Sequence, residues 1–184
     1  MRHFYNVQAS QSVLLVVDIQ EKLRPAMLHY QTVVDVTSQL IQAAQLHSIP
    51  IVFTQQYKQG LGDTEQQLKA LAPNGNYFDK SHFSACLEPN FIPLMKKCNR
   101  PQIIVVGMEA HVCVLQTCLD LIAHGFDIFI LLDGVSSRND LHRDLAVEQL
   151  RQAGAVISCA ESVIFQWTEV AATPLFKKIL KIVK

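Results

Sequence analysis

Five short apolar runs alternate along the chain with longer segments of helical periodicity. The runs are apolar at consecutive positions, which is typical of strands that are covered on both faces of a parallel sheet. They lie at residues 13–17, 51–53, 103–106, 128–132 and 155–157. Parallel strands need helical crossovers, so the pattern predicts an α/β fold: a three-layer α/β/α sandwich with a mostly parallel, Rossmann-like central sheet.

Three of the intervening segments have apolar residues at helical spacing. The expected helices cover residues 33–44, ending before Pro50, residues 112–122, capped by Gly125, and a segment that begins near Asn139 or Asp140 and ends by Gly154. No internal repeat or linker interrupts the chain, and 184 residues can form one complete core. We therefore expect residues 1–184 to form a single domain.

Two stretches, residues 55–79 and 81–101, break the alternation. The first contains Gly60, Gly62, Pro73 and Gly75, and the second contains Pro89, Pro93 and Pro101. Each contains one short helix candidate. Long irregular segments in a compact domain often shape a pocket. In parallel sheets, ligands bind beyond the carboxyl ends of the strands. That rule selects Asp18, Thr54, the segment Gly107–Cys113 and Asp133 as positions to inspect.

Charge and cysteine content narrow the possible partners. Sixteen basic and sixteen acidic residues give zero formal net charge, so a nucleic-acid partner is not expected. The five cysteines form no CxxC pair and no zinc spacing, and the first residues lack the apolar core of a signal peptide. No apolar run is long enough to span a membrane. These features predict free thiols in a reducing compartment, and a cytoplasmic protein.

The C-terminal segment 174–184 is amphipathic, with Leu175, Ile179 and Val183 on one face and lysines on the others. Such a helix could bind a membrane surface. A docking helix whose lysines complement its own dipole explains the pattern better, and we expect no membrane partner. A subunit contact at this helix, and hence a homo-oligomer, is part of the expectation.

Cys113 follows a strand and a turn, at the start of a helical segment. Unpaired backbone N–H groups and the positive end of the helix dipole favour a thiolate there, and the same N–H groups could stabilise an oxyanion. A buried, inert thiol is the commoner fate of a free cysteine. His111 is too close along one tight loop to act as the base of a Cys–His pair, and a phosphatase would need arginine where Leu119 stands.

Two charged residues stand where they could support this thiol. Asp18 ends the first apolar run and could act as a general base, although an Asp that caps the following segment fits the local sequence equally well. Lys80 lies in a partly apolar stretch, where a lysine is unusual. If Lys80 approached Asp18 and Cys113, its cation would favour both anions.

Together these segments resemble the isochorismatase-like cysteine hydrolase superfamily over essentially the whole chain, and the isochorismatase-domain-containing proteins most closely. The residues that carry the resemblance are those of segments 17–22, 56–57, 60–62, 79–84, 107–113, 133–138 and 158–163. The resemblance implies a catalytic triad of Asp18, Lys80 and Cys113. It also implies a non-proline cis peptide between Met108 and Glu109, and an oxyanion hole formed by the backbone N–H groups of Glu109 and Cys113.

The chain also departs from parts of this superfamily. Nicotinamidases carry an Asp-x-His metal cluster after the second strand, whereas this chain has Thr54-Gln55-Gln56-Tyr57-Lys58, so neither a metal nor another cofactor is expected. Isochorismatases proper lack the nucleophilic cysteine. The presence of Cys113 therefore favours acyl chemistry over enol-ether hydrolysis.

The resulting hypothesis is hydrolysis of a small-molecule amide or related acyl substrate through a thioester on Cys113. The pocket residues expected from their positions beside the triad are Gln20, Leu23, Tyr57, Phe83 and Val112, for each of which simple packing is an equal alternative. The competing hypothesis is a family member that kept the scaffold and acts as a binding protein, since a fold does not entail an activity.

Overall fold

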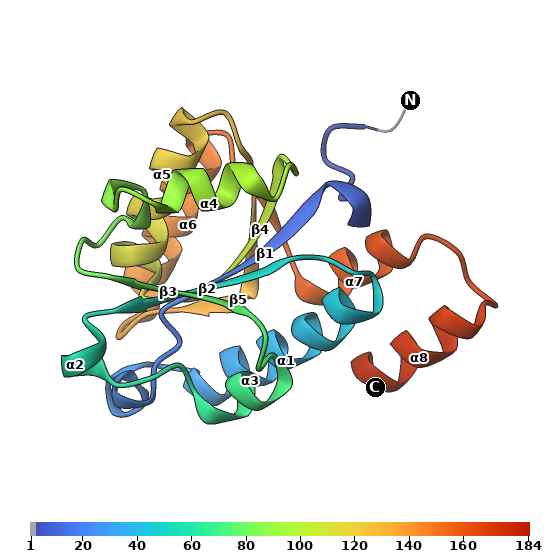
Figure 1. The fold of residues 1–184 in the computed structure, drawn as a ribbon, viewed down its shortest axis with the longest axis horizontal. Coiled ribbons are helices and arrows are strands. Elements are labelled where there is room, and N and C mark those ends of the chain that lie inside the picture. Colours follow the sequence, from blue (N-terminus) through green and yellow to red (C-terminus); the bar gives the residue numbers. More distant parts are fainter. Residues whose placement is uncertain (1–2) are drawn as a thin grey trace.

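The computed structural model describes residues 3–184. One six-stranded, entirely parallel sheet has helices on both faces (Figure 1). The strands are β1 (Ser12–Val17), β2 (Ile51–Gln56), β3 (Asn76–Lys80), β4 (Gln102–Met108), β5 (Asp127–Ser136) and β6 (Val156–Ser158). Their order across the sheet is β3-β2-β1-β4-β5-β6. The predicted three-layer α/β architecture is confirmed.

The remaining elements cover the two faces and the ends of the strands. The helices are α1 (Tyr30–Leu46), α2 (Lys58–Leu61), α3 (Gln66–Leu71), α4 (Phe91–Lys97), α5 (Leu115–Ala123), α6 (Asp140–Gln152), α7 (Ala160–Thr168) and α8 (Pro174–Val183). Shorter 3-10 or π turns are η1 (Ala9–Gln11), η2 (Glu21–Ala26), η3 (Ala85–Leu87) and η4 (Ala110–Val114). In Figure 1, α4, α5 and α6 lie on one side of the sheet, and α1, α3, α7 and α8 on the other.

Each face of the sheet has its own hydrophobic core, because successive strand residues point to opposite faces. In β1, Leu14 and Val16 pack with α1, α3, α7 and α8, whereas Leu15 and Val17 pack with α4, α5 and α6. All of β1, β2 and β4 is buried. The apolar runs of the sequence therefore predicted the central strands, and the strands extend a few residues beyond those runs.

Strand β3 and helices α2 and α7 were not predicted. The sequence leaves most of strand β3 in an irregular segment, because only its last residue is buried and its residues form no apolar run. Helix α7 is two turns long; the carboxylate of Asp133 accepts the Ala160 N–H at its start, at 3.0 and 3.1 Å. Asp133, inspected above as a site position, thus binds a helix N-terminus.

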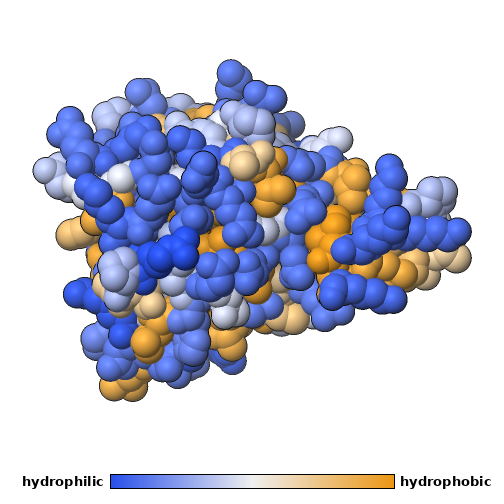
Figure 2. All heavy atoms as spheres, turned by 90° about the horizontal axis from the view of Figure 1, so that it is seen from below, coloured by the Kyte–Doolittle hydropathy of each residue, from blue (hydrophilic) through white to orange (hydrophobic). Residues whose placement is uncertain are grey.

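The amphipathic helix α8 packs through buried Ile179 against the α1 side of the molecule. Figure 2 shows that this face is mainly hydrophilic, with hydrophobic side chains gathered towards its projecting end on the right. The predicted docking helix is therefore present. Between residues 3 and 184, the helices are all too short or too polar to cross a membrane.

Candidate functional site

The site lies where the order of the strands reverses. From β1 the chain builds the sheet outward to β2 and β3, and then returns to place β4 on the other side of β1. The carboxyl ends of β1 and β4 therefore diverge into their crossovers at a shared crevice, the usual ligand position in open α/β sheets. Asp18 follows β1 directly, and Cys113 follows β4 by one turn.

Two backbone features bring these strand ends together. Gly107 pairs with Val17 in the ladder and has a φ of +137°, and a Cβ on it would lie 2.1 Å from the Val17 carbonyl oxygen. Only glycine permits this approach. Asp18 itself has a φ of 50°, a left-handed conformation that non-glycine residues seldom adopt outside functional or turn positions. The predicted cis peptide between Met108 and Glu109 is present.

The Asp18 carboxylate is buried and its two oxygens have different partners. Oδ1 accepts a hydrogen bond from the Thr54 hydroxyl at 2.7 Å. Oδ2 lies 2.8 Å from Lys80 Nζ in an ion pair, yet accepts no well-aligned hydrogen bond from any residue between 3 and 184. The ion pair places a cation against the carboxylate, while an acceptor position on Oδ2 remains for another donor.

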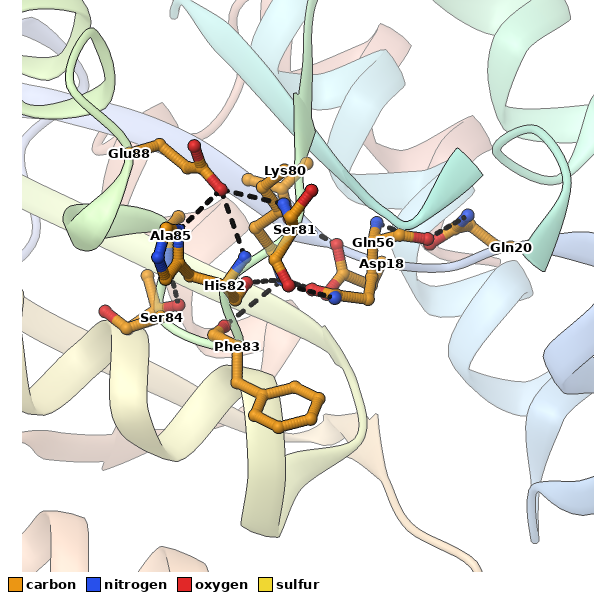
Figure 3. Close-up of polar contacts among 12 residues, drawn as sticks. Asp18, Gln20, Gln56, Lys80, Ser81, His82, Phe83, Ser84, Ala85 and Glu88 are labelled. Carbon is orange, nitrogen blue, oxygen red and sulfur yellow. Dashed lines mark hydrogen bonds and ion pairs between the residues drawn. The ribbon is translucent and has the colours of Figure 1, made fainter. Parts of the chain in front are cut away.

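Lys80 is the last residue of β3, and its side chain is fully buried. Its ammonium donates to Gln56 Oε1 at 2.6 Å and to the carbonyl oxygens of Phe83 and His82 at 3.1 and 3.3 Å (Figure 3). A buried cation requires this kind of compensation, since its desolvation is expensive. The predicted convergence of Lys80 with Asp18 is therefore found.

Cys113 lies in the π-helical turn η4, immediately before α5, and is 6% exposed. Asp18 and Lys80 are the two charged side chains that act on its thiol. Burial, and then the Asp18 charge, raise the pKa of the Cys113 thiol to about 12, although Lys80 acts in the opposite direction. The expectation that the helix terminus keeps this sulfur ionised is therefore wrong for the resting protein, because burial outweighs the dipole and the cation.

The acidic and imidazole groups nearest to Cys113 in sequence point elsewhere. Glu109 forms an ion pair with Arg138 Nε at 2.7 Å, so its charge is neutralised beside the thiol. His111 Nδ1 lies 3.0 Å from the Ser137 hydroxyl, and its ring packs against His142 with centroids 4.7 Å apart. Burial lowers the pKa of His111. Neither contact makes these groups a base for Cys113.

The five expected pocket residues differ in their surroundings. Phe83 and Tyr57 are more than half exposed at the ends of the loops near Lys80, and Val112 is partly buried next to Cys113. Leu23 packs on the core of the α1 side. Gln20 is fully buried, and its amide bonds the backbone of Gln56 and Gly62.

The sequence analysis did not predict the roles that three residues have in the site. Thr54 was selected only for its strand end, and Gln56 and Glu88 were given no role. Gln56 bonds Lys80, and Glu88 bonds the turn that follows Lys80. The only sequence feature that could have indicated these roles is a polar side chain at or near the end of a strand. Within residues 3–184, no group of three or more His, Cys, Asp or Glu side chains is arranged to hold a metal ion.

From the burial of the Asp18–Lys80 ion pair we expect Lys80 to have a large effect on the free energy of unfolding. Lys80→Met leaves the Asp18 carboxylate buried without its cation, and is expected to lower the free energy of unfolding by about 3–5 kcal/mol. The double variant Asp18→Asn/Lys80→Met removes both charges and should recover much of that loss. Urea unfolding at neutral pH measures both. Lys69→Met is the control, because Lys69 is a half-exposed lysine paired with Asp63. A Lys80→Met protein as stable as the Lys69→Met protein would contradict the prediction.

Comparison with known proteins agrees with the fold described above. The family model of the isochorismatase domain matches residues 12–162. A secreted isochorismatase effector, Isc1, of Phytophthora sojae is 41% identical over 94% of this chain and 84% of its own length. Isochorismatase domain-containing protein 1 of Danio rerio is 35% identical over 97% of this chain, which spans 63% of that relative. A solved structure of the MAR1 ribonuclease from Caenorhabditis elegans has a TM-score of 0.89 at 37% identity, covering 97% of this chain and 92% of the other.

Proposed function

Because this chain belongs to the isochorismatase family, whose members include hydrolases, we propose that it is a cysteine hydrolase that cleaves a small amide or related acyl compound through a thioester on Cys113. The observation that supports the proposal most directly is a buried carboxylate–ammonium pair, Asp18 and Lys80, whose charges act on the thiol of Cys113. A structural cysteine has no need of two buried charges, whose desolvation is expensive.

In the proposed acylation, the Cys113 proton moves to Asp18 Oδ2 as the sulfur attacks the substrate carbonyl. The new C–S bond pushes the carbonyl electron pair onto oxygen, where the backbone N–H groups of Glu109 and Cys113 would stabilise it, each contributing about 3 kcal/mol. The intermediate collapses, the C–N bond breaks, and Asp18 returns its proton to the departing amine. The product is a thioester on Cys113.

Deacylation follows the same path with water as nucleophile. Asp18 takes a proton from water as the hydroxide adds to the thioester carbonyl. Collapse then breaks the C–S bond, releases the acid, and the proton on Asp18 returns to the sulfur. Lys80 takes no part in these proton transfers, because its ammonium hydrogen bonds go to Gln56, His82 and Phe83. The role of Lys80 is therefore electrostatic.

A labelling experiment tests the proposal before any substrate is known. Cys86 is the matched internal control: burial also raises the pKa of its thiol to about 12, it is more exposed than Cys113, and neither Asp18 nor Lys80 influences it. We expect acrylamide, a small amide with an electrophilic carbon, to modify Cys113 at least about tenfold faster than Cys86 at pH 7.5. In the proposal Asp18 takes the Cys113 proton, whereas the Cys86 thiol donates to the Thr117 carbonyl, which is not a base. Peptide mass spectrometry of time points measures both rates.

A screen of small amides, thioesters and esters then identifies the substrate class, with mass spectrometry for an acyl adduct on Cys113. A short RNA is included, because the Caenorhabditis elegans neighbour is described as a ribonuclease. Equal labelling of Cys113 and Cys86 would support the alternative of a binding protein with an inert thiol. RNA cleavage that persists in a Cys113→Ala protein would also overturn the proposal.

A further inference from the structure

Gln56 occupies the gap between the strand that carries Lys80 and the strand that carries Asp18. Strand β2 separates β3 from β1, and Gln56 pairs directly with Lys80 in the β2–β3 ladder. The Lys80 side chain must therefore cross the end of β2 to reach Asp18. Gln56 is the last residue of β2, so its side chain meets the lysine on the way.

Both ends of the Gln56 side chain are bonded. Its Oε1 accepts from Lys80 Nζ at 2.6 Å, and its Nε2 donates to the Ser81 carbonyl at 2.7 Å. The amide of buried Gln20 in turn accepts from the Gln56 N–H at 2.8 Å and donates to the Gln56 carbonyl at 3.1 Å. Gln56 consequently has one orientation available, with its oxygen towards the ammonium (Figure 3).

Glu88 organises the turn that supplies the other two acceptors of Lys80. Its Oε1 accepts from the Ser81 N–H at 2.7 Å, from the His82 N–H at 3.0 Å and lies 2.9 Å from His82 Nδ1. The donors of this turn lower the pKa of Glu88 to about 2, so the carboxylate is ionised. The turn folded in this way directs the carbonyl oxygens of His82 and Phe83 at Lys80 Nζ.

We propose that Gln56 and Glu88 are positioning residues that hold the Lys80 ammonium with all its hydrogen bonds satisfied. Lys80 then acts on Asp18 and Cys113 as a fixed charge. Because its hydrogen bonds go elsewhere, Asp18 Oδ2 stays free for the cysteine proton. The proposal rests on the proposed function, since it concerns the same site. It goes further by assigning two residues outside the triad that control how the triad titrates. Neither residue contacts the reacting sulfur in the interactions described here.

The groups that accept from the Lys80 ammonium, namely Gln56 and the turn held by Glu88, are called the Lys80 cradle below. The first test adds a charge to this cradle. Gln56→Glu is nearly isosteric and places a second carboxylate on Lys80, which weakens the stabilisation of the anionic Asp18–Cys113 pair. The rate of acrylamide addition to Cys113 is measured between pH 4 and pH 9. We expect the acid-side midpoint of this profile to rise by about one pH unit, and the rate below it to fall about tenfold. Gln59→Glu, an exposed position on the same surface hollow as Lys80, adds the same charge outside the cradle and should shift the midpoint by less than about a third as much.

The second test separates the cradle from simple charge. Glu88→Gln and Glu88→Ala both remove one negative charge, but only alanine removes the acceptor that folds the turn. Charge alone would lower the midpoint in both variants, because a nearby anion disfavours ionisation. Loss of the cradle in Glu88→Ala should instead raise the midpoint by about half a unit, with Glu88→Gln equal to or below the wild type.

The outcomes are distinguishable from failure of the proposed function. If wild-type Cys113 reacts no faster than Cys86, the proposed function falls, and this inference with it. If wild-type Cys113 is reactive but Gln56→Glu leaves the midpoint unchanged, or the two Glu88 variants shift alike, only the positioning role is overturned. Circular dichroism melts establish that each variant is folded, and either pair of variants decides the question if a member of the other does not fold.

Discussion

Replacement of Cys113 by alanine is expected to abolish hydrolysis of every amide that the wild-type protein cleaves, a loss on the order of 10⁵-fold or more. The proposed reaction passes through a covalent bond to this sulfur. The other hydroxyl or thiol bonded to Asp18 is the buried Thr54 hydroxyl, an alcohol that is far harder to deprotonate. The loss should appear entirely in kcat, because the substrate can still bind. Initial rates on the best substrate of the screen, followed by ammonia or amine release, measure it.

The controls for this prediction separate chemistry from folding. Cys113→Ser keeps the shape of the side chain but offers an alcohol that is far harder to deprotonate, so it should be nearly as inactive as the alanine variant. Cys86→Ala removes a thiol with a similarly raised pKa and should retain wild-type turnover. Residual activity of more than about a hundredth in a folded Cys113→Ala protein would mean that water, activated by Asp18, attacks the substrate directly.

The central part of the fold follows from the sequence because its cause is local. Strands buried on both faces, such as β1 and β4, need apolar side chains at consecutive positions, and that pattern is visible in one dimension. Strand β3 lies at the sheet edge, where one side needs no neighbour and polar residues such as Asp79 are tolerated. Its pairing with β2 is a long-range contact, so its residues look like those of a loop when the sequence alone is considered.

The site divides in the same way. Asp18 and Cys113 could be selected from the rule that ligands bind beyond strand ends, since each follows an apolar run directly or by one turn. Lys80 could be noticed only as an unusual lysine, because its approach to Asp18 depends on the unpredicted edge strand. Gln56 and Glu88 act through hydrogen bonds to groups that a sequence does not place. Glutamine and glutamate at such positions are ordinary surface residues in the absence of coordinates.

The ionisation of Cys113 shows why a local rule failed. A position at the start of a helix favours a thiolate when the sulfur is partly exposed. Here the core on the α5 side of the sheet surrounds the turn η4, and Cys113 is part of that buried cluster. Desolvation is the largest influence on its pKa, and the Asp18 charge adds to it. The thiol is therefore protonated at rest, and for this reason the proposed mechanism requires a base, the role that it gives to Asp18.

Asp18→Asn is expected to separate alkylation of Cys113 from hydrolysis. In the wild type, a thiol with a pKa of about 12 has only about one part in 10⁵ of free thiolate at pH 7, so reactivity depends on proton transfer to Asp18. That transfer takes up no proton from solvent, and acrylamide addition should vary little between about pH 6 and pH 9. In the variant, one cause of the raised pKa is gone while Lys80 still lowers it, so the pKa of Cys113 falls below that of the wild type.

The Asp18→Asn protein should therefore lose the plateau. Its alkylation rate should increase about tenfold per pH unit up to the new pKa, because only ionised sulfur reacts. Hydrolysis should fall by about 10²–10⁴-fold at every pH, since no group remains to protonate the departing amine. Asp133→Asn is the control, an exposed carboxylate on strand β5 that bonds the start of α7 and should change neither profile. If the two alkylation profiles coincide, Asp18 is not the base, and the buried pair serves stability alone.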